Sequence, residues 1–233
     1  MSIEGGRTAE EKKKEPVFDF KKEYKELYMP KDKPVIVDVL DALRGGRWIY
    51  AGAADLPEVG ALLGKCADLC HELNLLRPSD RVERERLLRE ILGSAGERLV
   101  INSPFRCDFG FNIHVGDNFI GNFNLTILDE AEVRIGRNVQ IGPNCSLVTI
   151  THALDAAQRN AGVMRARPIT IGDNVWLASN VTVLPGVEIG AGSVIGAGSV
   201  VTRSIPANVV AVGSPCRVLR PIAEADRVEP IRL

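Results

Sequence analysis

The chain has 233 residues, of which 45% are hydrophobic and 25% charged, and its formal net charge is −1. This length is enough for one medium domain with an appendage, or for two small domains. The balanced charge excludes the strongly basic character typical of nucleic-acid-binding proteins, and the sequence has no run of about 18 apolar residues that would span a bilayer.

Residues 1–46 are predicted to form an N-terminal extension that is partly disordered. Its first residues, MSIEGGRTAEEKKKE, carry charges with no apolar segment after them, so they are not a secretory signal. The charge run is typical of a solvated tail. The five cysteines are scattered and odd in number, which favours a reduced, cytoplasmic setting.

Residues 47–98 are predicted to form a helical cap. Between residues 56 and 74 the apolar side chains fall on one helical face, and Pro57 suits the first turn. Asp80 and Glu83 have the spacing of a capping box that opens a second helix, which ends at Gly93.

The first of these helices carries Cys66 and Cys70 one turn apart. They are interpreted as small core residues rather than metal ligands. Both helices are expected to cover unpaired strand edges at the start of the next region.

The C-terminal third repeats with a period of six residues. An aliphatic residue recurs at this interval: Ile171, Leu177, Val183, Ile189, Ile195 and Val201. Neither a helix nor a lone strand has this period, whereas a parallel β-helix uses one hexapeptide for each side of its triangular section. The residue four further on is also expected to point inward: Val175, Val181, Val187, Ser193, Ser199 and Ile205. Gly172, Gly190 and Gly196 are predicted to supply unusual corner dihedrals.

The β-helix is predicted to span residues 99–220, followed by a C-terminal tail at 221–233. Two irregularities interrupt it. The phase slips by two residues between Ile127 and Ile135, and regularity is lost over residues 151–168 before it resumes. A long polar excursion from a rigid scaffold commonly carries function.

The chain has three histidines: His71, His114 and His152. His71 falls on the first amphipathic helix and His114 within a predicted strand. His152 begins the excursion, and an imidazole with a pKa near neutrality suits general-base work.

Several sequence segments resemble the maltose and galactoside O-acetyltransferases. They are PFRCDFGFNIHVGDNFIGNFNLTILDE, the loop that begins with Thr151 and His152, PITIGDNVW, VLPGVEIG, VIGAGSVVT and VGSPCRVLR. The resemblance covers residues 99–220 and, more loosely, the helices from residue 47. It implies a left-handed parallel β-helix and a homotrimer that moves acetyl from acetyl-CoA to a sugar hydroxyl, without a metal.

By this resemblance, His152 is the catalytic base and Asn122 lies beside the reacting centre, where its amide stabilises the oxyanion. Asp108 and Glu130 match positions that hold sugar hydroxyls, where the galactoside enzymes more often have serine and aspartate. Met164 matches a residue that lines the sugar site.

The resemblance also implies a donor groove between adjacent β-helices. Besides Asn122, its matched residues are Ser179, Ala197, Thr202, Arg203, Arg217 and Arg220. The two last arginines suit nucleotide phosphates. Trp176 either borders this groove or packs on a neighbouring subunit.

One departure concerns the acceptor. The family has an early acidic residue that reaches the sugar, and the aligned position here is Ala51, with Asp55 displaced by a few residues. The identity of the acceptor is therefore open.

Three alternatives remain. One is a xenobiotic acetyltransferase, and another is a non-catalytic β-helix binding module. The third is a γ-carbonic-anhydrase-like metalloenzyme, which needs three histidines around a metal. Within acyl transfer, direct attack is expected rather than an acyl-enzyme, because Cys145 falls on an inward position.

Overall fold

The computed structural model describes residues 36–50 and 57–231, which belong to the second of two units of the chain, residues 34–233. Most of the predicted extension, and both Ala51 and Asp55, lie outside the described residues. The helices are α2 (Ile36–Arg44), α3 (Pro57–Leu75), α4 (Arg81–Ile91), α5 (Ala156–Asn160) and the 3-10 helix η1 (Glu224–Asp226). No helix in the described part of the chain has the length and hydropathy of a membrane span.

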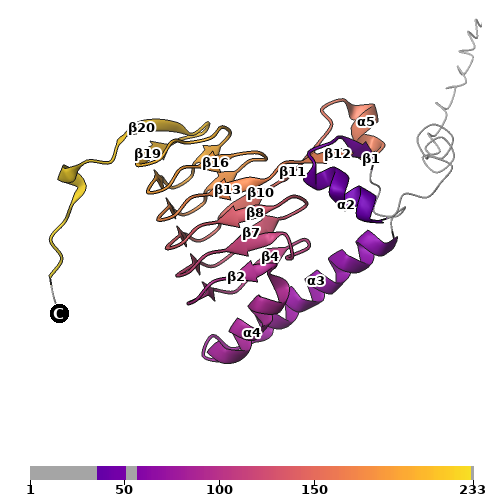
Figure 1. Cartoon of the computed structure of the whole chain (residues 1–233), viewed down its shortest axis with the longest axis horizontal. Helices are drawn as coiled ribbons and strands as arrows, with labels where there is room; N and C mark the ends of the chain where they lie inside the picture. The colour runs from indigo at the N-terminus through magenta and orange to yellow at the C-terminus, as the bar shows by residue number, and fades with distance from the viewer. Residues whose placement is uncertain (1–35, 51–56, 232–233) are drawn as a thin grey trace, which may run out of the picture. The chain divides into compact units, whose positions relative to one another are not determined.

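Three parallel sheets form the sides of a prism, and the chain visits them in turn (Figure 1). The first sheet contains β2 (Ser94–Ala95), β5 (Ile113–Val115), β8 (Val133–Ile135), β13 (Ile169–Ile171) and β16 (Glu188–Ile189). The second contains β3 (Val100–Ile101), β6 (Ile120–Gly121), β9 (Gln140–Ile141), β14 (Trp176–Leu177), β17 (Val194–Ile195), β19 (Val209–Val212) and β20 (Arg217–Pro221). The third contains β4 (Phe105–Cys107), β7 (Leu125–Leu128), β10 (Ser146–Val148), β15 (Thr182–Val183) and β18 (Val200–Val201).

This parallel β-helix confirms the predicted fold class. Strand pairing begins at Ser94, which pairs with His114, and so somewhat before residue 99. The six aliphatic residues of the repeat are at most 1% exposed, and the six inward residues that follow them are at most 6% exposed. The interior is therefore a stack of small and aliphatic side chains.

The corner glycines differ from the prediction. Gly172, Gly190 and Gly196 do not have positive φ; the positive values fall two residues later, for example at Asn174 (60°) and Gly192 (71°). Gly172 is needed for another reason: a Cβ there would lie 2.6 Å from the backbone nitrogen of Ala191 in the next coil. The glycines after the aliphatic residue therefore permit close stacking of coils, and Asn or Gly supplies the left-handed turn.

The helical cap is present. Helix α3 packs on β4 and on α4, and the buried hydrophobic residues of both helices join the β-helix core. Helix α4 begins after Asp80 as predicted, but the Asp80 side chain makes no capping hydrogen bond. The Glu83 carboxylate instead forms an ion pair with Arg86 at 2.8 Å, so the predicted capping box is not formed.

At the other end of the β-helix, β20 pairs antiparallel with β19. The two strands lie at the opposite end of the prism from α3 and α4 (Figure 1). This antiparallel strand is the last member of the second sheet.

A small antiparallel sheet projects from the side of the prism (Figure 1). It consists of β1 (Ile49–Tyr50), β12 (Val163–Ala166) and β11 (Ile150–His152), in that order. Val39 and Leu43 of α2 pack with Ala131 and Ala166 in a second, smaller core under this sheet. The excursion at 151–168 is thus a supported β-strand hairpin with α5 at its tip.

Candidate active site

The two irregularities in the repeat lie at the same corner of the prism. This corner, here called the wide corner, joins the third sheet to the first, and its segments in successive coils are 108–112, 129–132 and 149–168. The phase slip falls in the second segment and the excursion in the third. Asp108, Glu130 and His152 therefore belong to wide-corner segments of three consecutive coils.

His152 is exposed at the end of β11. It lies directly opposite Met164 in the β11–β12 ladder, and Met164 in turn lies opposite Ile49 of β1. Paired residues in a sheet share one face. The structure therefore brings His152 and Met164 together on a surface fixed by hydrogen bonds on both sides of β12.

Two carboxyl groups, of Asp108 and Glu130, are hydrogen-bonded to each other in the wide corner. Burial and the contact with Asp108 raise the pKa of Glu130 to about 8. Burial also raises the pKa of Asp108, against the lowering effect of its bond to Glu130. At neutral pH the pair therefore tends to hold a proton, and the protonated form of Glu130 is favoured. The Thr149 hydroxyl lies 3.4 Å from Glu130 Oε2.

A buried carboxylate that the sequence analysis missed supports this pair. Asp129 is fully buried and accepts backbone N–H bonds from Asp108 (3.1 Å) and Phe109 (2.9 Å). Burial raises the pKa of Asp129, and backbone hydrogen bonds from Phe109, Gly110 and Asn112 oppose that rise. Thr149, also missed, donates to the Leu128 carbonyl oxygen at 2.8 Å and so ties the neighbouring coil to the corner. Both residues occupy non-repeating corner positions, so periodicity gave no signal for them.

Asn122 lies at a different corner, the one that joins the second sheet to the third. Ser179 and Ala197 occupy the same corner in later coils, and the Gly198 N–H donates to the Ser179 carbonyl oxygen at 2.9 Å. The Asn122 Oδ1 atom accepts from the Phe123 N–H, so the amide nitrogen is the group presented for donation.

The third sheet separates Asn122 from His152. The strand β7, which follows Asn122, has four residues. A strand of this length spans about 13 Å. A single chain therefore does not bring Asn122 and His152 to one acceptor atom.

The remaining residues that the resemblance assigns to acetyl-CoA binding lie in two places, the wide corner and the end of the prism at β20. Thr202 and Arg203 are exposed and follow β18, at the wide corner. Arg217 and Arg220 are exposed on β20. Arg220 is ion-paired with Asp226 at 2.7 Å, a contact that a nucleotide phosphate would have to displace.

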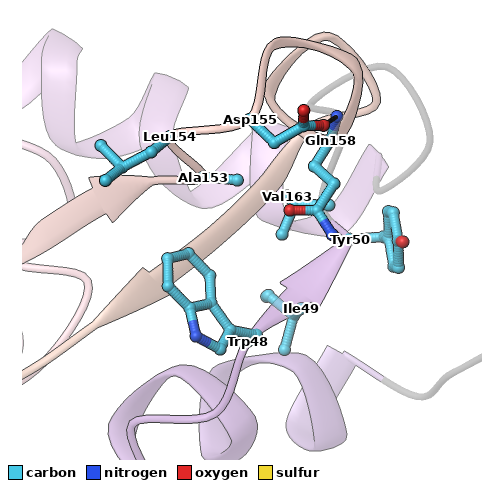
Figure 2. Close-up of a pocket in the computed structure, with 8 residues that line it drawn as sticks. All are labelled: Trp48, Ile49, Tyr50, Ala153, Leu154, Asp155, Gln158 and Val163. Atoms are coloured by element: carbon cyan, nitrogen blue, oxygen red, sulfur yellow. Dashed lines mark hydrogen bonds between the residues drawn. The ribbon is translucent and has the colours of Figure 1, made fainter.

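A hollow of about 480 Å³ lies beside the hairpin, between the segment around β1 and helix α5 (Figure 2). Its lining includes Trp48, Tyr50, Ala153 and Val163. The Ala153 N–H bonds to the Val163 carbonyl oxygen, one position beyond the pair formed by His152 and Met164. Successive residues of a strand point to opposite faces. The hollow therefore lies largely on the face away from His152.

The three histidines do not form a metal centre in the described part of the chain. His71 is exposed on α3, and the His114 Nδ1 atom lies 2.9 Å from the Ser94 Oγ atom on the first sheet. The one group in the described residues with metal-ligand spacing consists of cysteines. This arrangement does not support the γ-carbonic-anhydrase alternative.

The fold and the comparisons together define the class. Residues 168–203 match the bacterial transferase hexapeptide model (six repeats), and residues 53–96 match the maltose acetyltransferase hexapeptide capping motif. A parallel β-helix with this cap is the architecture of the hexapeptide-repeat acetyltransferases.

The chain belongs to the galactoside and maltose O-acetyltransferase family. It is 46% identical to the galactoside O-acetyltransferase of Escherichia coli (strain K12) over 187 residues, which cover 80% of this chain and 91% of that protein. It is 52% identical to the putative acetyltransferase YJL218W of Saccharomyces cerevisiae over 156 residues, covering 67% and 80% of the two chains.

Two solved structures are similar over most of their length. A galactoside acetyltransferase in complex with coenzyme A has a TM-score of 0.78 and 41% identity, covering 86% of this chain and 97% of that chain. A maltose O-acetyltransferase from Clostridium difficile 630 has a TM-score of 0.76 and 40% identity, covering 80% and 98%.

Proposed function

We propose that this chain is an acetyl-CoA-dependent sugar O-acetyltransferase in which His152 is the general base. The observation that carries the proposal is the exposed imidazole of His152, which lies opposite Met164 on the supported hairpin. This hairpin extends from the corner that also holds the Asp108–Glu130 pair. The donor and the type of acceptor follow from the family, whose relatives include a galactoside O-acetyltransferase and a structure with coenzyme A.

The proposed reaction is a direct transfer. The imidazole of His152 accepts the proton of an acceptor hydroxyl while that oxygen attacks the thioester carbonyl of acetyl-CoA. The resulting oxyanion accepts a hydrogen bond from the Asn122 amide. The carbon–sulfur bond then breaks, and the coenzyme A thiolate takes the proton from the imidazolium.

The cysteines do not suit an acyl-enzyme route. All five are buried. Cys145, the nearest to His152 in sequence, is fully buried, and its thiol donates to the Ala178 carbonyl oxygen at 3.1 Å. A buried thiol in apolar surroundings is inert as a nucleophile, and burial raises the pKa of Cys145.

The site is completed by a second copy of the chain in this proposal. Asn122 lies before the strands of the third sheet begin, and His152 lies beyond the ends of these strands. One copy is therefore proposed to supply the base, and its neighbour the amide. Exposed apolar side chains lie on either side of Asn122: Ile120 is 42% exposed and Phe123 54%. Trp176, two strands further along the second sheet from Ile120, is 51% exposed. A ring of three copies satisfies every site with one type of interface, so a homotrimer is expected.

The acetyl-CoA site has the same two-sided construction. Ser179 and Ala197 share the corner of Asn122, whereas Thr202 and Arg203 share the wide corner with His152. A donor that lies between neighbouring copies contacts both sets. Arg217, which is exposed on β20, is proposed to bind the nucleotide phosphates at the end of that groove.

The acceptor is proposed to be a sugar or related small molecule whose hydroxyl groups bond to Asp108 and Glu130. A protonated Glu130 donates and Asp108 accepts, which suits hydroxyl groups that do both. Since the galactoside enzymes more often have serine and aspartate here, the preferred sugar is expected to differ from theirs.

The test is an acceptor screen. Purified protein is incubated with acetyl-CoA and a panel of mono- and oligosaccharides, and free coenzyme A is detected as a thiol. Acetyl ester on the sugar is confirmed by mass spectrometry. Thiol release that depends on a sugar supports the proposal, whereas retention of coenzyme A without transfer to any hydroxyl or amine would favour the binding module.

A further inference from the structure

Three thiols meet where the helical cap contacts the β-helix. Cys66 and Cys70 come from α3, and Cys107 from β4. The Cys107 Sγ atom lies 3.5 Å from that of Cys66 and 3.7 Å from that of Cys70, and all three sulfurs lie within 4.8 Å of one another. All three side chains are at most 8% exposed, and the proposed acetyl transfer uses none of them.

The position of Cys107 in its sheet is unusual. The residues that align with it in the following coils are Ile127, Leu147 and Val183, all aliphatic and buried. Sulfur replaces an aliphatic side chain at the coil that α3 covers. Cys66 and Cys70, four residues apart on α3, face this coil together. The three sulfurs therefore form one cluster, to which α3 contributes two thiols and β4 one.

The spacing of the sulfurs suits a single ion bound to all three. An ion with metal–sulfur bonds of about 2.3 Å in a three-coordinate plane holds its sulfurs about 4 Å apart, and a pyramidal ion holds them closer. Soft thiolate ligands select soft ions. The distances between the three sulfurs therefore fit a thiophilic ion with three thiolate ligands.

The surroundings limit the charge of that ion. Structural Zn²⁺ almost always takes four ligands. The buried carboxylate of Asp129 already accepts backbone N–H bonds from Asp108 and Phe109. Zn²⁺ with three thiolates leaves one net negative charge, and Cu⁺ leaves two, in a buried site. The negative charge of Asp129 opposes thiolate charge there, and the positive charge of Arg106 favours it. Burying net charge is costly. A trivalent ion with three thiolates is neutral.

We propose that Cys66, Cys70 and Cys107 form a binding site for trivalent arsenic, held as a neutral tris-thiolate. Arsenous acid, As(OH)₃, reacts with the three thiols; three arsenic–oxygen bonds break, three arsenic–sulfur bonds form, and three waters leave with the thiol protons. Neither arsenic nor sulfur changes its oxidation state. The bound ion joins α3 covalently to β4, so it stabilises the docking of the cap on the first coils.

The experiment uses the full-length protein in a buffer with a phosphine reductant and no dithiol. Sodium arsenite is added to the folded protein, and also to protein that refolds from urea, so that slow entry into a buried site does not hide binding. Native mass spectrometry counts arsenic per chain, and arsenic-edge X-ray absorption counts sulfur neighbours. The expected result is one arsenic with three sulfurs, and a higher Tm.

The variants separate this site from the other cysteines. Cys107→Val gives the coil the aliphatic side chain seen at Val183, and Cys70→Ala removes a helix thiol. Both should lose the three-sulfur arsenic and the rise in Tm, while their circular dichroism remains that of a folded chain. Cys145→Ala and Cys216→Ala, which remove buried thiols elsewhere, should retain both.

Several results would overturn the assignment. These are absence of arsenic after both loading procedures, arsenic bound to two sulfurs or fewer, or unchanged three-sulfur binding in Cys107→Val. In a parallel competition, displacement of arsenic by an equimolar amount of Zn²⁺ or Cu⁺ would contradict the charge argument.

Discussion

The carboxyl groups of Asp108 and Glu130, which come from adjacent coils, are hydrogen-bonded to each other. Such a pair is stable only while it holds a proton. Because the pKa of Glu130 is raised to about 8, the folded chain binds more protons than the unfolded chain between about pH 4.5 and pH 8. The free energy of unfolding therefore falls as pH rises through this window.

The first prediction is that Glu130→Gln flattens this dependence. The amide retains a donor towards Asp108 but does not titrate. Urea denaturation at several pH values from 5 to 8 should show a slope for wild type of at most about 1.4 kcal/mol per pH unit from this group, and a smaller slope for the variant. Equal slopes would assign the pH dependence to other groups.

The second prediction concerns His152→Ala. Loss of the general base should lower kcat by about 10²- to 10⁴-fold, while acetyl-CoA affinity changes little. The fold should persist, because His152 is exposed at the end of β11. His71→Ala, which removes an exposed histidine on α3, is the matched control and should retain activity. Near-normal turnover of His152→Ala on the best acceptor would refute the mechanism.

The third prediction tests the two-copy site by complementation. His152→Ala and Asn122→Ala chains are each expected to be nearly inactive. If equal amounts are co-expressed and assemble at random into trimers, about a quarter of the sites receive both an intact base and an intact amide. Activity should then recover to about that fraction of wild type. No recovery in trimers shown by mass spectrometry to be mixed would place both groups in one chain.

The fourth prediction is that Arg217→Ala raises the KM for acetyl-CoA by about tenfold, with a smaller effect on kcat at saturation, because a charge-assisted bond to a phosphate is lost. The KM of wild type and of the variant is measured with acetyl-CoA and, for comparison, with a dephospho-coenzyme A thioester. A fall in kcat with an unchanged KM would move Arg217 from donor binding to the reacting centre.

The fifth prediction concerns the close stacking of coils. Gly172→Ala places a Cβ 2.6 Å from the Ala191 nitrogen, so it should destabilise the fold by about 1–3 kcal/mol. Gly64→Ala is the control: it lies on the exposed side of α3 with nothing within 4 Å of the added Cβ. It should stabilise the fold by about 0.5–1 kcal/mol, as measured by chemical denaturation.

The period of the sequence predicts the interior of the fold but not its corners. Ile171 and Val175 are buried as predicted because the pattern is local and repeats in every coil. The role of Gly172 was predicted wrongly, because its contact is with the next coil, beyond the reach of a pattern along the chain.

The sequence predicts some residues of the candidate site and misses others, for a related reason. His152 stands out because it begins a break in the repeat. Asp129 and Thr149 give no such signal, since their roles depend on backbone groups of neighbouring coils. Cys66 and Cys107 are 41 residues apart in sequence, so their contact is visible only after α3 docks on β4. The separation of Asn122 from His152 likewise depends on the position of the third sheet.

The antiparallel pairing of β20 with β19 has a consequence for the protein at high concentration. A stack of parallel coils can in principle grow without limit, since each end offers hydrogen-bonding groups in the polarity that another copy would continue. Here one end is covered by α3 and α4, and on the second sheet the other end closes with a strand of reversed direction. A further parallel coil cannot continue that sheet in register, so end-to-end fibres are disfavoured and lateral contact between prisms remains available.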